Sequence, residues 1–266
     1  MRRKGIKQTR SREADLHGIQ IATVSHIGSR EAQQDAFGIS DYRNEMPVKE
    51  KGILAILSDG MGGLSGGESA SITAVSICQE YFKSAPMTDA PWQELLRMTV
   101  QANRNVLQMS RSSCGQAGAT LICAYLKPEG LYFVSVGDSR ICLLRAGGLI
   151  NLNRAHVFAR TLDTEEAFGR RDSNEAQTHP ERAALSSYIG MEELTQIDFN
   201  MTAVRLLRGD TVLLMSDGVF NTLQEAEITA VLSGKNPEEE LALMQQMILQ
   251  KGKPAQDNFT ALALQL

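Results

Sequence analysis

The sequence has few aromatic residues and no excess of positive charge. Phe, Trp and Tyr make up 5% of its 266 residues, and 27 Lys and Arg stand against 31 Asp and Glu, a formal net charge of -4. A general nucleic-acid-binding protein is expected to be basic and to offer aromatic rings on which bases stack. The composition therefore argues against nucleic acid as a partner.

Cysteine motifs and long hydrophobic runs are also missing. The four cysteines, Cys78, Cys114, Cys123 and Cys142, form no CxxC pair. Neither a zinc knuckle nor a redox motif is indicated, and reduced buried thiols are the simplest interpretation. No segment approaches the roughly 20 apolar residues that cross a bilayer, and the N-terminus lacks the apolar region of a secretory signal. These absences predict a cytoplasmic protein without membrane insertion.

Basic residues are concentrated at the N-terminus. Residues 1–12 hold six basic side chains and no acidic one, so residues 1–17 are expected to form a solvated, flexible tail, with an anionic contact site as the alternative. The rest of the chain shows no repeat and no linker of Pro, Gly or Ser. A single domain is therefore predicted over residues 18–266, which is long enough to bury a full core.

Short apolar runs bounded by turns alternate with segments of helical periodicity. The runs predict strands at residues 19–25, 53–58, 119–126, 131–136, 141–145, 211–216 and 259–266. The periodic segments predict helices at residues 68–83, 92–109, 225–233 and 238–250. Three of the strands lie between Leu121 and Arg145 with only turns between them, which favours an antiparallel meander. This order predicts an α+β fold.

Residues 153–190 differ from the rest of the chain. The segment is polar and charged and has no clear apolar period. A stretch of this length without a pattern of its own is typical of a functional flap or a mobile insertion. We therefore expect a flap over residues 153–190 that selects the substrate.

Four aspartates stand at the ends of predicted strands. Asp59 and Asp217 each follow a strand within a Ser-Asp-Gly sequence, whereas Asp35 and Asp257 each precede one. Because the end of one antiparallel strand lies beside the start of its neighbour, all four carboxylates are expected to converge on one sheet edge. Four like charges repel one another unless cations lie between them. Oxygen ligands without His or Cys favour Mg²⁺ or Mn²⁺ over zinc.

Each of these features also has a simpler interpretation. A single Asp-Gly after a strand is typically a turn, and the pattern alone leaves turns and a metal site equally open. The glycine-rich run at residues 60–67 lacks the Lys-Ser/Thr of a phosphate-binding loop, because Glu68 and Ser69 follow it. It is either a flexible loop or a segment whose backbone approaches an ion or ligand closely.

Six short segments, in this order, carry a family resemblance. They are Arg30-Glu31-Ala32-Gln33-Gln34-Asp35-Ala36, Ser58-Asp59-Gly60-Met61-Gly62-Gly63 with Gly66-Gly67-Glu68, Gly118-Ala119-Thr120-Leu121, Val136-Gly137-Asp138-Ser139-Arg140, Ser216-Asp217-Gly218 and Asp257-Asn258-Phe259-Thr260. Together they resemble the PP2C (PPM) family of metal-dependent protein serine/threonine phosphatases, in a bacterial stand-alone form. The resemblance implies a four-layer αββα sandwich of two central antiparallel sheets flanked by helices.

The resemblance also implies a set of metal ligands. Asp59 would bridge two Mn²⁺ or Mg²⁺ ions, with the backbone carbonyl of Gly60 as a further ligand. Asp217 and Asp257 would complete the first ion's site. Asp138 is linked in the family to a third, weaker ion, and a turn aspartate is its alternative interpretation.

Two residues would act beside the ions. Asp35 would act catalytically from the second shell, through metal-bound water. Arg30 would clamp the substrate phosphate, a task that suits the planar guanidinium, and a surface salt bridge is its alternative. The chain departs from the family pattern at Gln34, where an acid is common, at Met61, where some relatives have His, and at Ala155 before His156. His156 is a candidate whose alternative is an ordinary packing histidine.

These residues predict hydrolysis of phosphoserine and phosphothreonine by direct attack of a metal-bridging hydroxide, without a phosphoenzyme. The expected partners are phosphorylated proteins and a cognate bacterial serine/threonine kinase, and the enzyme is expected to be a monomer. The combination is reminiscent of phosphatases that control type VI secretion. Two alternatives are a catalytically inactive phosphatase-like binding module, against which the intact acids argue, and an unrelated two-metal hydrolase, which would typically use His ligands.

Overall fold

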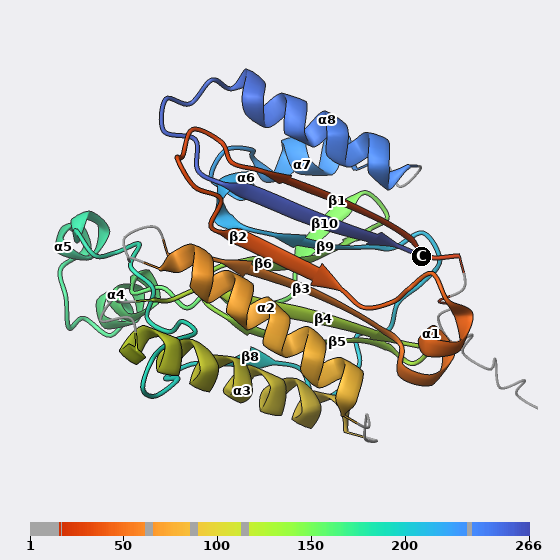
Figure 1. The fold of residues 1–266 in the computed structure, drawn as a ribbon. Helices are drawn as coiled ribbons and strands as arrows, with labels where there is room; N and C mark the ends of the chain where they lie inside the picture. The colour runs from red at the N-terminus through yellow and green to blue at the C-terminus, as the bar shows by residue number, and fades with distance from the viewer. Residues whose placement is uncertain (1–15, 17, 62–65, 86–89, 113–116, 233–235) are drawn as a thin grey trace, which may run out of the picture.

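Two antiparallel five-stranded sheets lie face to face in the computed structural model (Figure 1), which describes residues 16, 18–61, 66–85, 90–112, 117–232 and 236–266. The first sheet has the order β1 (Gln20–His26), β10 (Phe259–Gln265), β9 (Thr211–Met215), β6 (Arg140–Arg145), β7 (Gly148–Asn151). The second has the order β2 (Asp35–Ile39), β3 (Ile53–Asp59), β4 (Leu121–Lys127), β5 (Gly130–Val136), β8 (Asp198–Phe199). The α+β sandwich predicted from the sequence is confirmed.

Helices cover the outer face of each sheet. The long helices α2 (Gly67–Ser84) and α3 (Pro91–Ser112) lie on the second sheet, and α7 (Glu225–Val231) and α8 (Pro237–Gln250) lie on the first (Figure 1). The shorter helices are α1 (Glu45–Lys51), α4 (Ala159–Ala167), α5 (Ser173–Thr178) and α6 (Asp217–Phe220). The layers therefore run helix, sheet, sheet, helix.

The central strands are apolar on both faces, which explains their unbroken hydrophobic runs. In β3, Ile53, Ala55 and Leu57 belong to the cluster between the two sheets. Leu54 and Ile56 belong to the cluster under α2 and α3. Because neighbouring side chains of a strand point to opposite faces, a strand in the middle of four layers buries every residue, and the alternation of a half-exposed strand is lost.

The predicted meander is wrong at its third strand. β4 and β5 pair as a hairpin, with Lys127 opposite Gly130, but β6 pairs with β7 and β9 in the other sheet. The chain crosses between the sheets after β5, where Gly137 adopts a φ of +103°. That backbone conformation costs glycine little, and it turns the chain away from a continued hairpin.

The predicted flap contains two short helices that periodicity did not reveal, α4 and α5. Each buries a single side chain, Leu162 and Ala176 respectively, so neither has an apolar stripe that a sequence pattern would show. An isolated bridge between Val157 and Leu185 joins the two ends of the segment to each other, and a bridge between Ala119 and Ile189 joins its C-terminal end to the rest of the fold.

Some sequence predictions concern residues outside those described. Of the predicted tail only Leu16 is described, and it is buried in the cluster between the sheets. Cys78, Cys123 and Cys142 are buried free thiols, as expected, whereas Cys114 lies outside the described residues, as does the middle of the glycine-rich run, residues 62–65. None of the described helices is both long and apolar enough to cross a bilayer.

Candidate metal centre

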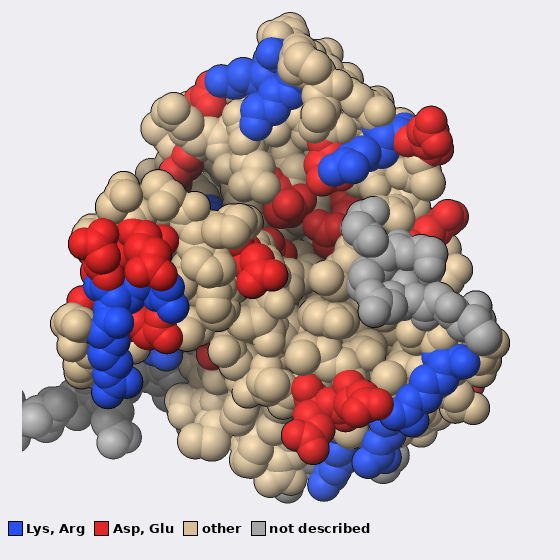
Figure 2. Space-filling model, turned by 90° about the vertical axis from the view of Figure 1, so that its left-hand side faces the viewer, with Lys and Arg blue, Asp and Glu red and all other residues tan. Residues whose placement is uncertain are grey.

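The predicted aspartates come from both sheets and meet at the same end of the sandwich. Asp35 begins β2 and lies directly opposite Asp59, the last residue of β3. Asp217 follows β9, and Asp257 shortly precedes β10 in the other sheet. The expectation that all four share one sheet edge is therefore wrong in detail, because each sheet supplies two of them. The convergence itself holds, and Figure 2 shows acidic side chains gathered in a hollow near the middle of this face.

The two Ser-Asp-Gly sequences fasten the centre through their serines. Ser216 Oγ donates a hydrogen bond of 2.8 Å to Asp35 Oδ2 and accepts one of 2.9 Å from the Thr260 backbone N–H. This bond ties the second sheet to the first. Ser58 Oγ donates to the carbonyl oxygen of Thr120. Both serines are fully buried, so the repeat places a carboxylate at a strand end and holds that end in place.

Burial and mutual repulsion raise the pKa values of the clustered carboxyls. Burial raises the pKa of Asp35 to about 6, and burial together with the charges of Asp138, Asp257 and Asp35 raises the pKa of Asp217 to about 7. The pKa of Asp59 lies well above its usual value because of burial and of the charges of the other four acids. Burial also raises the pKa of Asp138. The predicted third-ion residue therefore belongs to the same cluster.

One buried carboxylate oxygen lacks a partner. Asp35 is only 7% exposed, and its Oδ1 makes no hydrogen bond within the described chain. An unsatisfied buried oxygen is costly, and amid further carboxylates a positive charge would satisfy it. A set of oxygen donors with no His or Cys fits a hard divalent cation such as Mg²⁺ or Mn²⁺. The residues present thus fit the ions that the sequence predicts.

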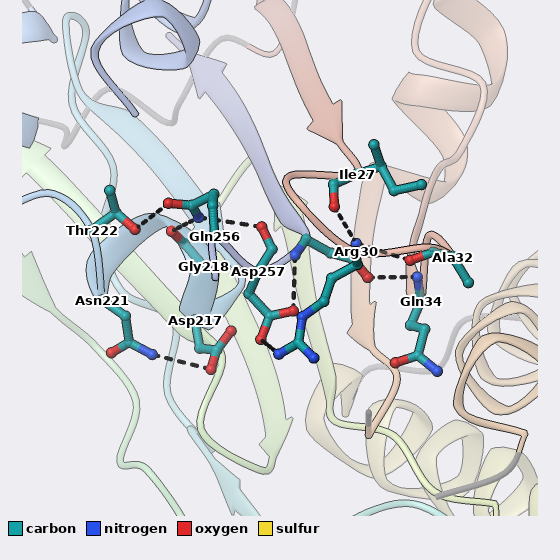
Figure 3. A network of polar contacts seen from close by, with 11 residues as sticks. Ile27, Arg30, Ala32, Gln34, Asp217, Gly218, Asn221, Thr222, Gln256 and Asp257 are labelled. Carbon is teal, nitrogen blue, oxygen red and sulfur yellow. Dashed lines mark hydrogen bonds and ion pairs between the residues drawn. The ribbon is translucent and has the colours of Figure 1, made fainter. Parts of the chain in front are cut away.

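The predicted phosphate clamp lies against one of the predicted ligands. Arg30 Nη2 donates to Asp257 Oδ2 at 2.8 Å, and the two side chains are 49% and 40% exposed (Figure 3). Asp257 Oδ1 accepts a hydrogen bond from the Asn258 backbone N–H. Among the described residues, no three Asp, Glu, His or Cys side chains are arranged to hold an ion. The ion pair with Arg30 occupies one carboxylate oxygen of Asp257, which is a predicted metal ligand.

The glycine of each Ser-Asp-Gly sequence lies so close to another backbone segment that no side chain would fit. A Cβ on Gly60 would overlap the carbonyl oxygen of Gly67, and a Cβ on Gly218 would overlap that of Asn258. The Gly60 N–H donates to the carbonyl oxygen of Gln34 at 3.0 Å. At its described ends the glycine-rich run thus approaches other backbone segments closely, while its predicted approach to an ion or ligand stays a prediction.

Asn258 is a structural residue of the site that sequence reasoning missed. Its side-chain Nδ2 donates to the carbonyl oxygens of Ile27 and Ala32, and its Oδ1 accepts from the backbone N–H of Gln34. It therefore shapes the loop that carries Arg30. The one sequence feature that could have pointed to this role of Asn258 is its position directly after Asp257.

His156 is engaged by backbone groups. Its Nδ1 accepts a hydrogen bond from the Gly137 backbone N–H at 3.1 Å, and the backbone N–H of His156 donates to the Gly137 carbonyl oxygen at 2.8 Å. Burial lowers the pKa of His156, so the imidazole is neutral near pH 7. These contacts agree with the packing alternative and fix the turn that carries Asp138.

The protein phosphatase 2C family model matches residues 23–245 of the chain. The serine/threonine phosphatase stp of Listeria monocytogenes is 28% identical over 211 residues, covering 77% of this chain and 79% of that protein. The serine/threonine protein phosphatase PstP of Mycobacterium tuberculosis is 29% identical over 244 residues, which cover 90% of this chain and 45% of PstP.

Solved structures share the fold. PppA, described as a key regulatory component of T6SS in Pseudomonas aeruginosa, superposes with a TM-score of 0.73 and 25% identity, covering 93% of this chain and 97% of the other. The catalytic domain of PstP in complex with 2 manganese ions superposes with a TM-score of 0.71 and 25% identity, with the same coverage of both chains.

Proposed function

Because the chain belongs to the protein phosphatase 2C family, we propose that it is a metal-dependent protein serine/threonine phosphatase. The observation that carries this proposal is the cluster of five aspartates at one end of the two sheets, with a buried carboxylate oxygen of Asp35 left unpartnered. Bacterial relatives named as serine/threonine phosphatases support the same activity.

Divalent ions supply an activated water and neutralise a phosphoryl group when they are bound in such a site. Asp59 is the side chain on which all the other acids act, which suits a ligand shared by two ions, with the Gly60 carbonyl beside it. Asp217 and Asp257 would complete one site, and Asp138 would hold a further, weaker ion. Asp35 would position and accept protons from water, since Ser216 holds its Oδ2 and its buried Oδ1 has no partner within the described chain.

Arg30 would bind the substrate phosphate once Asp257 turns to an ion. We expect Arg30→Gln to lower kcat/KM for an aryl phosphate by about 10- to 100-fold, because a charge-assisted hydrogen bond is worth about 1.5–3 kcal/mol. The affinity for Mn²⁺ should not fall, since Arg30 competes for Asp257. Steady-state kinetics and calorimetry measure the two effects. A weaker Mn²⁺ affinity would contradict the competition, and Arg208→Gln, an exposed arginine before β9, is the matched control.

The substrates we propose are phosphoserine and phosphothreonine in proteins, made by a cognate serine/threonine kinase, with the enzyme acting as a monomer in the cytoplasm. The neighbour described as a T6SS component supports a comparable role in the control of secretion. The flap, residues 153–190, would select among substrates, because loops beside a rigid site commonly do so.

Metal removal tests the proposed function. The purified chain is expected to hydrolyse an aryl phosphate and a phosphothreonine peptide with Mn²⁺ or Mg²⁺, and to lose essentially all activity in excess EDTA, because the acids alone repel a phosphate. Activity that persists in EDTA would refute metal dependence. Calorimetric Mn²⁺ binding without turnover would instead favour an inactive, phosphatase-like binding module.

A further inference from the structure

A cleft of about 510 Å³ lies between α4 and the segment that leads into β8. Three arginines line it, Arg154 and Arg160 from the start of the flap and Arg170 after α4, and all three are exposed. His156 lies at its buried side. The cleft is separate from the aspartate cluster described above, and none of its residues was assigned a role there beyond the packing of His156.

The three arginines have no ion-pair partner within the described part of the chain. Two acids also line the cleft, but both already accept hydrogen bonds: Glu165 Oε2 from Arg171 Nε at 2.7 Å, and Asp198 Oδ2 from the Arg154 backbone N–H at 2.8 Å. The cleft thus presents three guanidinium groups against two carboxylates that are otherwise engaged. The N–H donors of these guanidinium groups are suited to binding anions.

The other arginines of the flap show what a structural role looks like in this segment. Arg171 pairs with Glu165 and Glu175, and Arg182 pairs with Asp163 at 2.8 Å. These pairs fasten α4 and α5 to each other and to the returning chain. Arg154, Arg160 and Arg170 make no such pairs, although acids lie within the same segment. Fastening the flap therefore does not account for them.

The cleft borders the metal centre. His156 accepts the N–H of Gly137. Two residues further on, Ser139 Oγ lies 2.8 Å from Thr120 Oγ1, which accepts the backbone N–H of Asp59 at 2.9 Å. A peptide whose phosphorylated residue reaches the aspartate cluster also carries neighbouring residues, which can extend toward this cleft. A free phosphate monoester has no such residues.

We propose that the cleft formed by Arg154, Arg160 and Arg170 binds acidic side chains that flank the phosphorylated residue of a protein substrate. This inference rests on the proposed phosphatase function and adds a substrate preference to it. The charges would strengthen binding of the peptide without touching the phosphate, so they would act on peptides and leave aryl phosphates unaffected.

The test compares two phosphothreonine peptides that differ only in flanking Glu against flanking Gln. At low ionic strength the wild type is expected to show a kcat/KM about 3- to 10-fold higher for the Glu peptide, the range of a few exposed charge pairs. The preference should shrink at high salt, where the Debye length falls to about 3 Å. The double variant Arg160→Gln/Arg170→Gln should bring the ratio to within about twofold of unity.

Two controls separate the possible outcomes. Arg208→Gln removes one positive charge in the segment before β9, at the opposite end of that strand from Asp217, and should keep the preference. Aryl phosphate hydrolysis should be unchanged in every variant. Equal kcat/KM values for the two peptides, or a preference that survives in the double variant, would overturn the cleft's role while leaving the phosphatase intact. If aryl phosphate is not hydrolysed at all, the proposed function fails, and fluorescence anisotropy with the same peptides decides the cleft's preference independently.

Discussion

Asp59→Asn is expected to lower metal-dependent phosphatase activity by at least about a thousandfold. Bound ions lower the activation barrier by several kcal/mol, and losing them has an effect of that order. Asp59 lies opposite Asp35 across β2 and β3, and the charges of four other acids converge on it. Asparagine keeps the shape of the side chain but provides one neutral oxygen in place of a shared negative charge.

The same substitution is expected to stabilise the metal-free protein. Asp59 is buried beside like charges, and this raises its pKa well above the usual value, so its ionised form is unfavourable in the folded state at neutral pH. Removing that charge relieves the cost, and each kcal/mol gained corresponds to a rise in Tm of roughly 2–4 °C for a chain of this size. Activity and stability should therefore change in opposite directions.

Asp210→Asn is the matched control. Asp210 is a buried acid too, but it pairs with Arg145 at 2.6 Å and accepts the Leu207 N–H. Its substitution should lower Tm, because it leaves a paired arginine without its partner, and it should preserve activity below the melting transition. Mn²⁺ titration, calorimetric melting in EDTA and aryl phosphate assays measure all these quantities. Asp59→Asn protein that melts lower than the wild type in EDTA would contradict the repulsion.

Local sequence predicted which residues come together at the candidate metal centre but not how the chain brings them there. The Ser-Asp-Gly repeats and the aspartates before strands are short-range patterns, and the structure brings all of them to one place. The partition between sheets depends on contacts between distant residues. β1 pairs with β10, joining Gln20 to Gln265, and no local pattern specifies that pairing. The pairing of β6 with β9, in place of the predicted meander, likewise depends on contacts between distant residues.

The polar contacts around the site were beyond sequence reasoning for a related reason. Ser216 and Asn258 each have a plausible local use in a turn, so nothing in the sequence reveals that Ser216 reaches Asp35, 181 positions away. Arg30 was predicted as a phosphate clamp, and its alternative was a surface salt bridge. The structure shows an ion pair with Asp257, which is a predicted metal ligand, so the salt bridge is observed and the phosphate clamp stays a prediction.

Raising the pH from about 4 to about 7 is expected to destabilise the metal-free protein through its aspartate cluster. The folded-state pKa values of Asp35 and Asp217 are about 6 and about 7, against an ordinary value of 3.8. Below the ordinary value both states hold these protons. As the pH rises through this window, the unfolded chain releases them while the folded cluster retains them. The free energy of the unfolded state then falls relative to that of the folded state, and stability falls.

The loss of stability has an expected size, and Mn²⁺ is expected to reverse it. Each pH unit between the folded and unfolded pKa is worth about 1.4 kcal/mol, so Asp35 alone contributes a loss on the order of 3 kcal/mol across the window. Mn²⁺ at 100 times its dissociation constant should restore about 2.7 kcal/mol near neutral pH, because cations bind the ionised acids of the folded state. Urea titrations in EDTA and in Mn²⁺ between about pH 4 and pH 7 measure both curves. Carboxylates elsewhere in the chain contribute equally to the EDTA and the Mn²⁺ curves. If the difference in stability between the two curves does not grow with pH, the clustered aspartates are not the groups that bind the ions.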